Sequence, residues 1–187
     1  KVGIFDVSHM GEVIISGIKK MKNINYLFTN DFTNMTDGRV RYSPMCNPDG
    51  GVIDDLLIYR MNQDKYLVVV NASNREKDVA WMKDNIFGQV NLEDISDSIA
   101  QIALQGPKAK TVLAKLADEY NIPEKYYTFI ENGKVADVEC LISQTGYTGE
   151  HGYELYCQAE NAQKLWNALL QAGKEEGLLP CGLGARD

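Results

Sequence analysis

Residues Gly50–Tyr59 read GGVIDDLLIY, a glycine turn that leads into an apolar strand. The turn starts at Asn47 and contains the Pro-Asp-Gly sequence that tight turns favour, so it joins this strand to an earlier strand predicted over 39–45. A second turn at 62–64 leads to a third apolar strand over 66–70. Three consecutive strands joined by two short turns predict an antiparallel β-meander, and this meander decides the fold class.

The segments on either side of the meander contain similar elements. The middle strand of the meander is predicted over 52–60. Outside the meander, strands are predicted over 2–5, 11–16, 99–104, 126–130, 135–143 and 153–157, and helices over 18–28, 73–87, 108–117 and 159–176. Ser73 and Glu76 have the spacing of a capping box at the start of the second helix. The similar order in both halves predicts an α+β fold of duplicated strand–helix–strand–helix lobes with mostly antiparallel sheets. We expect the lobes, 1–95 and 96–187, to pack tightly because no Ser- or Pro-rich linker separates them.

Composition and charge argue against two classes of partner. Of the 187 residues, 44% are hydrophobic and 24% are charged, which is ordinary for a soluble globular protein. The 19 basic and 26 acidic residues give a formal charge of −7, so we expect no nucleic-acid partner, because such a surface needs a basic face. No apolar run approaches the roughly 20 residues of a membrane span, so we expect no membrane association.

The cysteines and the chain ends carry further information. Cys46, Cys140, Cys157 and Cys181 lie far apart and form no Cys-x-x-Cys pair, so the sequence predicts free thiols and no metal site. Free thiols favour a reducing compartment, either cytosol or organelle matrix. Because the chain starts with Lys1 and stops without a closing helix, we expect an excised piece of a longer protein whose targeting signal is not visible.

The acids Asp54 and Asp55 are the first candidates for chemistry. Carboxylates within an apolar strand are costly unless each has water or a partner. Because successive side chains of a strand alternate, Asp55 is expected to share a face with Leu57 and Asp54 with Leu56, so at most one acid faces a given pocket. The alternative is that both acids belong to the preceding turn.

The second candidate is the glycine-dense loop Thr145–Glu154, which reads TGYTGEHGYE. It lacks the lysine and the following helix of a phosphate-binding P-loop. Glycine lets a backbone approach a ligand closely, and Tyr147 and Glu154 have the chemistry to stack on and hydrogen-bond a flat heterocycle. The alternative is an ordinary hairpin loop.

Three weaker signals complete the list of candidates. Asn71 lies at a strand end, where polar residues often project into a cleft, although capping of the next helix is an alternative role for it and for Ser73. Residues 182–187 place Arg186 among small residues. His9 has no nearby Ser or Cys in a nucleophile arrangement, so we interpret it as structural.

Six segments in order resemble the T-protein of the glycine cleavage system, an aminomethyltransferase. They are 5–11 (FDVSHMG), 50–59 (GGVIDDLLIY), 70–74 (VNASN), 104–107 (LQGP), 145–150 (TGYTGE) and 182–187 (GLGARD). The resemblance implies an enzyme that takes an aminomethyl group from the lipoyl arm of the H-protein and passes its methylene carbon to tetrahydrofolate, releasing ammonia. It also implies a three-domain fold around a folate channel, in which this chain supplies most of the folate-binding part and lacks the C-terminal barrel.

The resemblance also implies roles for single residues. Asp55 matches the family's catalytic acid, which assists proton transfer at the folate nitrogens and stabilises positive charge. Glu154 matches the residue that pairs with the amino-pyrimidine edge of the pterin. The other implied folate-binding positions are Met10, Tyr42, Leu57, Val70, Asn71, Tyr127, Tyr147 and Arg186. The central expectation is that Asp55 and Glu154 line a single slot for a reduced pterin.

The implied partners are lipoylated H-protein and tetrahydrofolate, which acts as the acceptor, with no metal. A bacterial source implies the cytoplasm, which we favour, and a eukaryotic source implies the mitochondrial matrix. Because family members start earlier and continue beyond residue 187, we expect this piece alone to have little or no transferase activity.

Two other assignments compete with this one. The folate domain of a sarcosine or dimethylglycine dehydrogenase has the same fold behind a flavin-binding module, but its loops usually differ at the first acid of the pair Asp54–Asp55. A non-enzymatic folate-binding accessory factor for iron–sulfur protein assembly carries a Lys-Gly-Cys-Tyr motif, which this sequence does not contain.

Overall fold

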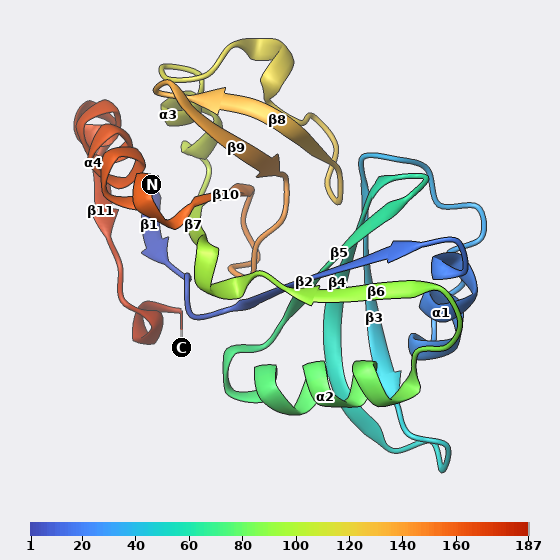
Figure 1. Ribbon diagram of the computed structural model, residues 1–187. Helices are drawn as coiled ribbons and strands as arrows, with labels where there is room; N and C mark the ends of the chain where they lie inside the picture. Colours follow the sequence, from blue (N-terminus) through green and yellow to red (C-terminus); the bar gives the residue numbers. More distant parts are fainter. Residues whose placement is uncertain (187) are drawn as a thin grey trace. The chain divides into compact units, whose positions relative to one another are not determined.

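The computed structural model describes residues 1–186, and the chain divides into two units that each carry one sheet and two α-helices (Figure 1). Met10–Ser96 form the first unit, whereas Lys1–His9 and the described residues from Asp97 onward form the second unit. The first nine residues join the second unit because their strand pairs with strands of that sheet.

The first unit contains the predicted meander. Its elements are β2 (Gly11–Gly17), α1 (Lys20–Leu27), β3 (Arg39–Cys46), β4 (Val52–Asn62), β5 (Lys65–Val70), α2 (Arg75–Asn85) and β6 (Val90–Asp94). The sheet has the order β3-β4-β5-β2-β6, and all these pairings are antiparallel. Ile15, Ile58 and Val68 point to one face of this sheet and are fully buried against the two helices, which forms the core of the unit.

The second unit is built around a six-stranded sheet. Its elements are β1 (Val2–Asp6), β7 (Ile99–Gln105), α3 (Ala109–Leu113), β8 (Phe129–Val135), β9 (Val138–Ser143), β10 (Gly152–Gln158), α4 (Ala162–Gly173) and β11 (Leu178–Pro180). The order is β11-β1-β7-β10-β9-β8; β1 pairs with β11 in parallel, and the other pairings are antiparallel. Leu165 and Leu169 of α4 are fully buried on this sheet, as the helical spacing predicts.

The two units repeat one topology. The order β2-α1-β3-β4-β5-α2-β6 of the first unit matches the order β7-α3-β8-β9-β10-α4-β11 of the second. The spatial order also matches, because β3-β4-β5-β2 corresponds to β8-β9-β10-β7. In each unit both helices cover the same face of the sheet, so the opposite face carries side chains that no helix of that unit covers. The predicted α+β fold with duplicated lobes and mostly antiparallel sheets is confirmed.

The capping-box prediction is wrong. Ala72–Asn74 form a short 3₁₀ turn, and α2 begins at Arg75 without a hydrogen bond from a capping side chain. Instead, the Asn74 amide donates to the Asp54 carboxylate at 3.1 Å. Asn74 therefore links this turn to β4, a contact that the spacing of Ser73 and Glu76 does not predict.

Strand boundaries between 126 and 143 also differ from the prediction. Tyr127 has a φ of 60°, a left-handed conformation that regular strands lack, so β8 begins at Phe129. Ala136 and Asp137 have φ values of 51° and 59° and form the tight turn that separates β8 from β9. The sequence does not predict β6 or β11, because both are short edge strands, of five and three residues. The helices α2, α3 and α4 end earlier than predicted.

Candidate functional site

The acids of β4 lie on opposite faces of the first unit's sheet, as the alternation predicts. Asp54 is 7% exposed and lies on the helix-covered face with Leu56 and Ile58. Asp55 is exposed and lies on the opposite face with the half-buried Leu57. Both acids are strand residues, so the alternative that they belong to the turn is wrong.

Two predicted residues, Tyr42 and Asn71, lie beside the Asp55 carboxylate. The Tyr42 hydroxyl donates to Asp55 Oδ2 at 2.8 Å, because Tyr42 pairs with Leu57 in the neighbouring strand and its long side chain reaches diagonally to position 55. Asn71 Nδ2 donates to the Asp55 carbonyl oxygen at 3.0 Å and lies 3.5 Å from Asp55 Oδ1. On this exposed face the Tyr42 phenol holds one oxygen of the Asp55 carboxylate, and the Asn71 amide lies beside the other.

The structure does not bring every predicted apolar residue of the first unit to this face. Leu57 is on it, and Met10 is half-buried just before β2. Val70 is fully buried in the helix-covered core with Val68, on the face opposite Leu57. Val69, the strand neighbour of Val70, pairs with Leu57 and shares its face.

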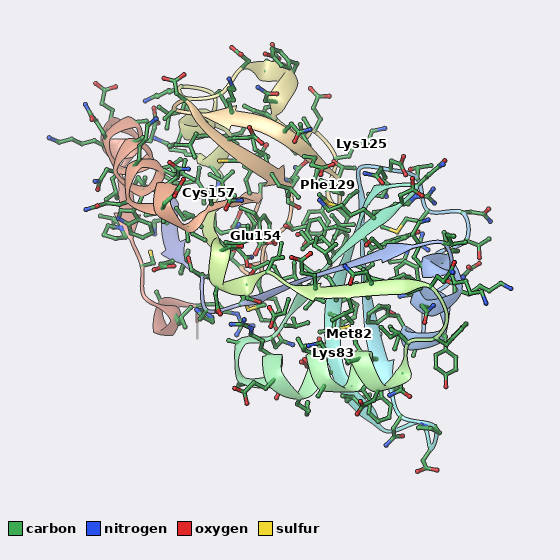
Figure 2. All side chains as sticks on the ribbon, viewed as in Figure 1. Met82, Lys83, Lys125, Phe129, Glu154 and Cys157 are labelled. Carbon is green, nitrogen blue, oxygen red and sulfur yellow. The ribbon has the colours of Figure 1, made fainter. Side chains whose placement is uncertain are left out.

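Glu154 of β10 also lies on the face opposite the helices of its unit (Figure 2). Gln101 Nε2 donates to Glu154 Oε1 at 3.0 Å, and the Thr145 hydroxyl donates to Glu154 Oε2. Burial raises the pKa of Glu154 above its usual value, and the hydrogen bonds from Thr145 and Gln101 act in the opposite direction. The carboxylate is therefore held in a fixed orientation in a poorly solvated place.

The loop that precedes Glu154 is packed around one buried glutamine. Gln105 Nε2 donates to the backbone oxygens of Thr145 and Tyr153 at 3.2 and 3.3 Å, and Gln105 Oε1 accepts from the Thr148 hydroxyl at 3.0 Å. A Cβ atom at Gly146 or Gly152 would overlap the Gln105 side chain. These glycines therefore allow the loop to close over Gln105.

Tyr147 and Arg186 contact each other at the exposed end of this loop. The Arg186 guanidinium lies 3.7 Å from the centre of the Tyr147 ring, and its Nε donates to the Tyr147 carbonyl oxygen at 3.1 Å. Tyr147 is 77% exposed. Asp187 of the predicted segment 182–187 lies outside the described residues.

Tyr127 is half-buried in the turn before β8, and its ring lies 4.5 Å from that of Tyr126. Its left-handed backbone and its hydrogen bond from N–H to the Gln144 carbonyl oxygen at 3.0 Å fix its position.

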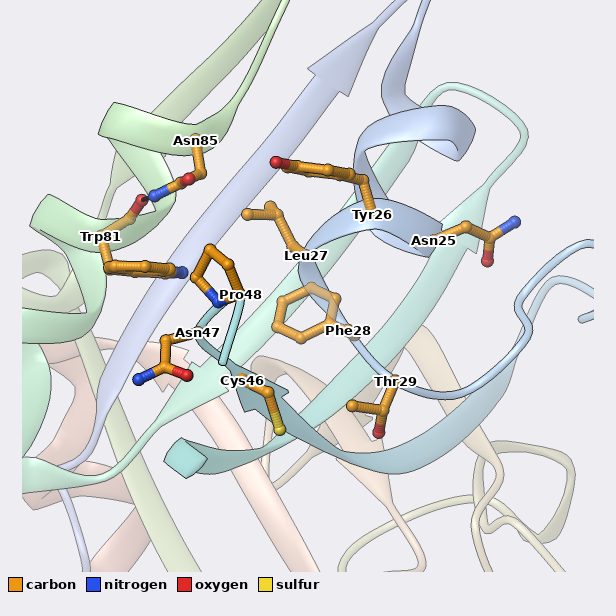
Figure 3. A pocket seen from close by; sticks show the side chains of 10 residues that line it. All are labelled: Asn25, Tyr26, Leu27, Phe28, Thr29, Cys46, Asn47, Pro48, Trp81 and Asn85. Atoms are coloured by element: carbon orange, nitrogen blue, oxygen red, sulfur yellow. Dashed lines mark hydrogen bonds between the residues drawn. The ribbon is translucent and has the colours of Figure 1, made fainter. Parts of the chain in front are cut away.

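A cavity of about 430 Å³ in the first unit is lined by residues of α1, α2 and the β3–β4 turn (Figure 3). Trp81, Pro48 and Tyr26 contribute much of its wall, and Asn47 and Asn85 contribute amides. None of the predicted site residues lines it. Within residues 1–186, no cluster of His, Cys, Asp and Glu has the geometry to hold a metal ion, and no helix is long and apolar enough to cross a membrane.

Several residues around the two acids were not predicted as site residues, although Thr145, Gln105 and Asn74 lie in segments that carry the family resemblance. Gln101, Thr145 and Gln105 hold Glu154 and its loop, while Asn74 and the fully buried Asp78 surround Asp54. Polar residues inside apolar strands are a usable signal, and Gln101 and Gln105 carry it within β7. Asp78 carries no such signal, because an acid on a helix usually faces solvent.

Comparison with known proteins identifies the family of this chain. The model of the GCVT N-terminal domain family matches residues 1–187. An aminomethyltransferase of Anoxybacillus flavithermus is 52% identical over 187 residues, which cover 100% of this chain and 51% of that protein. An aminomethyltransferase of Bacillus subtilis is 49% identical over 185 residues, which cover 99% of this chain and 51% of that protein. The chain thus spans about half the length of the curated relatives it matches.

Two solved structures are similar in fold. The crystal structure of the glycine cleavage system aminomethyltransferase T from Bartonella henselae has a TM-score of 0.86 at 30% identity, covering 100% of this chain and 49% of that one. A heterotetrameric sarcosine oxidase from a Corynebacterium species has a TM-score of 0.64 at 13% identity, covering 93% of this chain and 84% of that one. The second likeness concerns the fold alone.

Proposed function

The chain belongs to the GCVT N-terminal domain family, and we propose that the protein carrying it is a tetrahydrofolate-dependent aminomethyltransferase of the glycine cleavage system. Its proposed reaction moves the methylene carbon of an aminomethyl group, carried on the lipoyl arm of an H-protein, to tetrahydrofolate with release of ammonia. Relatives near 50% identity that are named aminomethyltransferases support this reaction. Because the chain covers about half of their length, the activity is proposed for the whole protein.

The position of Asp55 carries the proposal. Of two adjacent acids, one is buried and saturated with donors, and the other is exposed on the face opposite the helices. The exposed carboxylate is oriented by the Tyr42 hydroxyl at 2.8 Å and by the Asn71 amide. A carboxylate held this way is suited to exchange a proton with a reacting nitrogen and to stabilise nearby positive charge.

Glu154 supplies the proposed recognition of the pterin. An amino-pyrimidine edge presents N–H donors in a plane, which a carboxylate accepts well. Gln101 and Thr145 already orient the Glu154 carboxylate, and the adjacent Gln101 Oε1 is buried without a hydrogen-bond partner among the described residues. The described residues thus fit a flat heterocycle that donates hydrogen bonds, and the exposed Tyr147 ring offers a stacking surface.

We propose separate roles for Asp55 of the first unit and Glu154 of the second unit. The roles differ: Glu154, Tyr147 and Arg186 would bind the pterin, while Asp55 would serve the reacting nitrogens. For a bacterial source, as in the relatives named above, the proposed compartment is the cytoplasm.

The direct test measures both products with the full-length protein. Purified protein is mixed with tetrahydrofolate and with H-protein whose lipoyl arm carries the aminomethyl group, and 5,10-methylenetetrahydrofolate and ammonia are followed together. We expect equal amounts of both, with no methylenetetrahydrofolate when H-protein lacks its lipoyl group. We also expect the 187-residue chain alone to show little or no turnover. Failure of the full-length protein to form methylenetetrahydrofolate would contradict the proposed function.

A further inference from the structure

A buried acid on α2 lies behind the Asp54–Asp55 pair. Asp78 is fully buried, and as an ionised carboxylate neither of its oxygens has a hydrogen-bond donor among residues 1–186. The ammonium group of Lys77 is 3.8 Å away, but that side chain is 51% exposed and donates to the Ile53 carbonyl oxygen at 2.7 Å. A buried carboxylate without donors is costly, so Asp78 needs a proton or a partner.

A protonated Asp78 can donate a hydrogen bond to the Asp54 carboxylate. Its Oδ1 accepts from Asn71 Nδ2 at 2.9 Å and from the Asp55 backbone N–H at 3.0 Å, and its Oδ2 accepts from Asn74 Nδ2 at 3.1 Å. With the protonated Asp78 as a fourth donor, these hydrogen bonds stabilise the ionised form of Asp54.

The charges around the two acids indicate which one holds the proton. The charged groups that act on Asp78 are Asp54 of β4 and Lys77 of its own helix. Burial, followed by the hydrogen bond and negative charge of Asp54, raises the pKa of Asp78 to about 8, and Lys77 acts against this. Burial also opposes ionisation of Asp54, but the hydrogen bonds from Asp78, Asn71, Asn74 and the Asp55 backbone hold its pKa below the usual value.

We propose that Asp78 is a positioning residue that donates a hydrogen bond to Asp54 and thereby fixes Asn71 against the catalytic Asp55. This inference rests on the proposed function for the role of Asp55. The same Asn71 nitrogen that donates to Asp54 Oδ1 lies 3.0 Å from the Asp55 carbonyl oxygen and 3.5 Å from Asp55 Oδ1. If Asp54 shifts, Asn71 loses its anchor, and the Asp55 carboxylate loses one of the two groups that orient it.

The proposal predicts an alkaline limit on turnover. When Asp78 loses its proton, two buried carboxylates face each other and repel, so Asp54 moves and the contact of Asn71 with Asp55 is disturbed. Turnover of the wild-type protein should therefore fall with a midpoint near pH 8, the pKa of Asp78.

The test compares D78N and D78L in the full-length protein. An asparagine keeps the size of Asp78 and donates an N–H to Asp54, whereas leucine donates nothing. D78N should keep kcat within about threefold of wild type at pH 7 and lose the fall near pH 8, whereas D78L should lower kcat about tenfold or more with little change in KM. D84N, which changes an exposed acid of the same helix, should leave the pH profile unchanged.

Unfolding provides a readout that does not depend on turnover. The pKa of folded Asp78 lies above its ordinary value of 3.8, so this acid contributes stability at low pH that is lost as the pH rises to about 8. D78N should remove this part of the pH dependence, and D84N should retain it. The carbonyl stretch of a protonated carboxylic acid, followed by infrared spectroscopy, should titrate near pH 8 in wild type and be absent in D78N.

The outcomes separate the two proposals. If the wild-type protein makes no methylenetetrahydrofolate but D78N flattens the unfolding profile, the proposed function fails and the Asp54–Asp78 hydrogen bond stands. If turnover is present and D78N keeps the alkaline fall, or D78L keeps full kcat, the positioning role of Asp78 is wrong.

Discussion

The two units place an acid on equivalent faces of equivalent sheets, but the acids have different surroundings. Asp55 of β4 and Glu154 of β10 both lie opposite the helices of their own unit. Asp55 is exposed, with one oxygen bound by the Tyr42 hydroxyl. Glu154 is half-buried, and each of its oxygens accepts a hydrogen bond from a buried polar side chain.

This difference indicates a division of roles within a repeated fold. An acid that moves protons benefits from access to the reacting atom and to solvent. An acid that recognises a ligand benefits from a fixed direction and from weak solvation, because its hydrogen bonds then discriminate more strongly. The topology supplies the same platform twice, and the neighbouring side chains decide which role each platform can take.

The largest expected effect tests the proposed catalytic role of Asp55. D55N keeps the size of the side chain and the hydrogen bond to Tyr42 but removes the negative charge and the basic oxygen. We expect kcat of the full-length protein to fall about 10²- to 10⁴-fold, the usual contribution of a positioned acid or base. Because Asp55 is exposed, the melting temperature of the D55N variant should differ little from that of the wild-type protein. Steady-state formation of methylenetetrahydrofolate measures the first effect and calorimetry the second.

D54N provides the matched control for D55N. Asp54 accepts from several donors in the core, so its loss should lower stability by about 1–3 kcal/mol and reduce kcat less than D55N does. If D54N abolishes turnover while D55N is tolerated, the assignment of catalytic and supporting acids is reversed.

The next effect concerns binding at Glu154. E154Q replaces one carboxylate oxygen with a donor, so tetrahydrofolate affinity should fall about 10- to 100-fold, as expected when a charged hydrogen bond is lost. The raised pKa of Glu154 means that the ionised form is lost at a higher pH than for an ordinary glutamate. Wild-type affinity should therefore weaken as the pH falls through this pKa, and E154Q should lack that acidic loss. Isothermal titration calorimetry across the acidic range measures both.

E150Q is the control within the same loop. Glu150 is exposed, so its substitution should leave both the affinity and its pH dependence near the wild-type values. Equal losses in E150Q and E154Q would indicate a general effect of charge near the loop and would remove Glu154 from its recognition role.

The sequence predicts the fold well because the fold depends on local patterns. The turn at 47–51 and the apolar runs around it determine the meander, and the alternation in β4 correctly separates Asp54 from Asp55. The helical spacing in α4 likewise predicts its buried leucines. These features need only neighbours in sequence, so they are visible without a structure.

The parts that sequence reasoning did not predict depend on contacts between distant residues. The Asn74 side chain donates a hydrogen bond to Asp54, 20 residues earlier. The expected capping box does not form at the start of α2. Gln105 contacts a loop 40 residues later, and its place in an apolar strand indicates a buried partner without identifying that loop. Val70 follows the apolar strand pattern, but only the pairing of β5 with β2 and β4 shows that it points into the core.

The smallest expected effect concerns the glycines that allow the second unit to hold Glu154. A Cβ at Gly152 would overlap the Gln105 side chain, so G152A should lower stability by about 1–3 kcal/mol, as overpacking does, and should weaken tetrahydrofolate binding through displacement of the loop. G149A separates overlap from backbone strain, because Gly149 has a φ of 71° and open space around it, and it should cost roughly 1 kcal/mol. Urea unfolding of both variants measures which substitution lowers the free energy of unfolding more. If G149A destabilises the protein more than G152A, the packing of the loop on Gln105 does not hold the Glu154 site, and the contrast between the two units rests on the side chains around each acid alone.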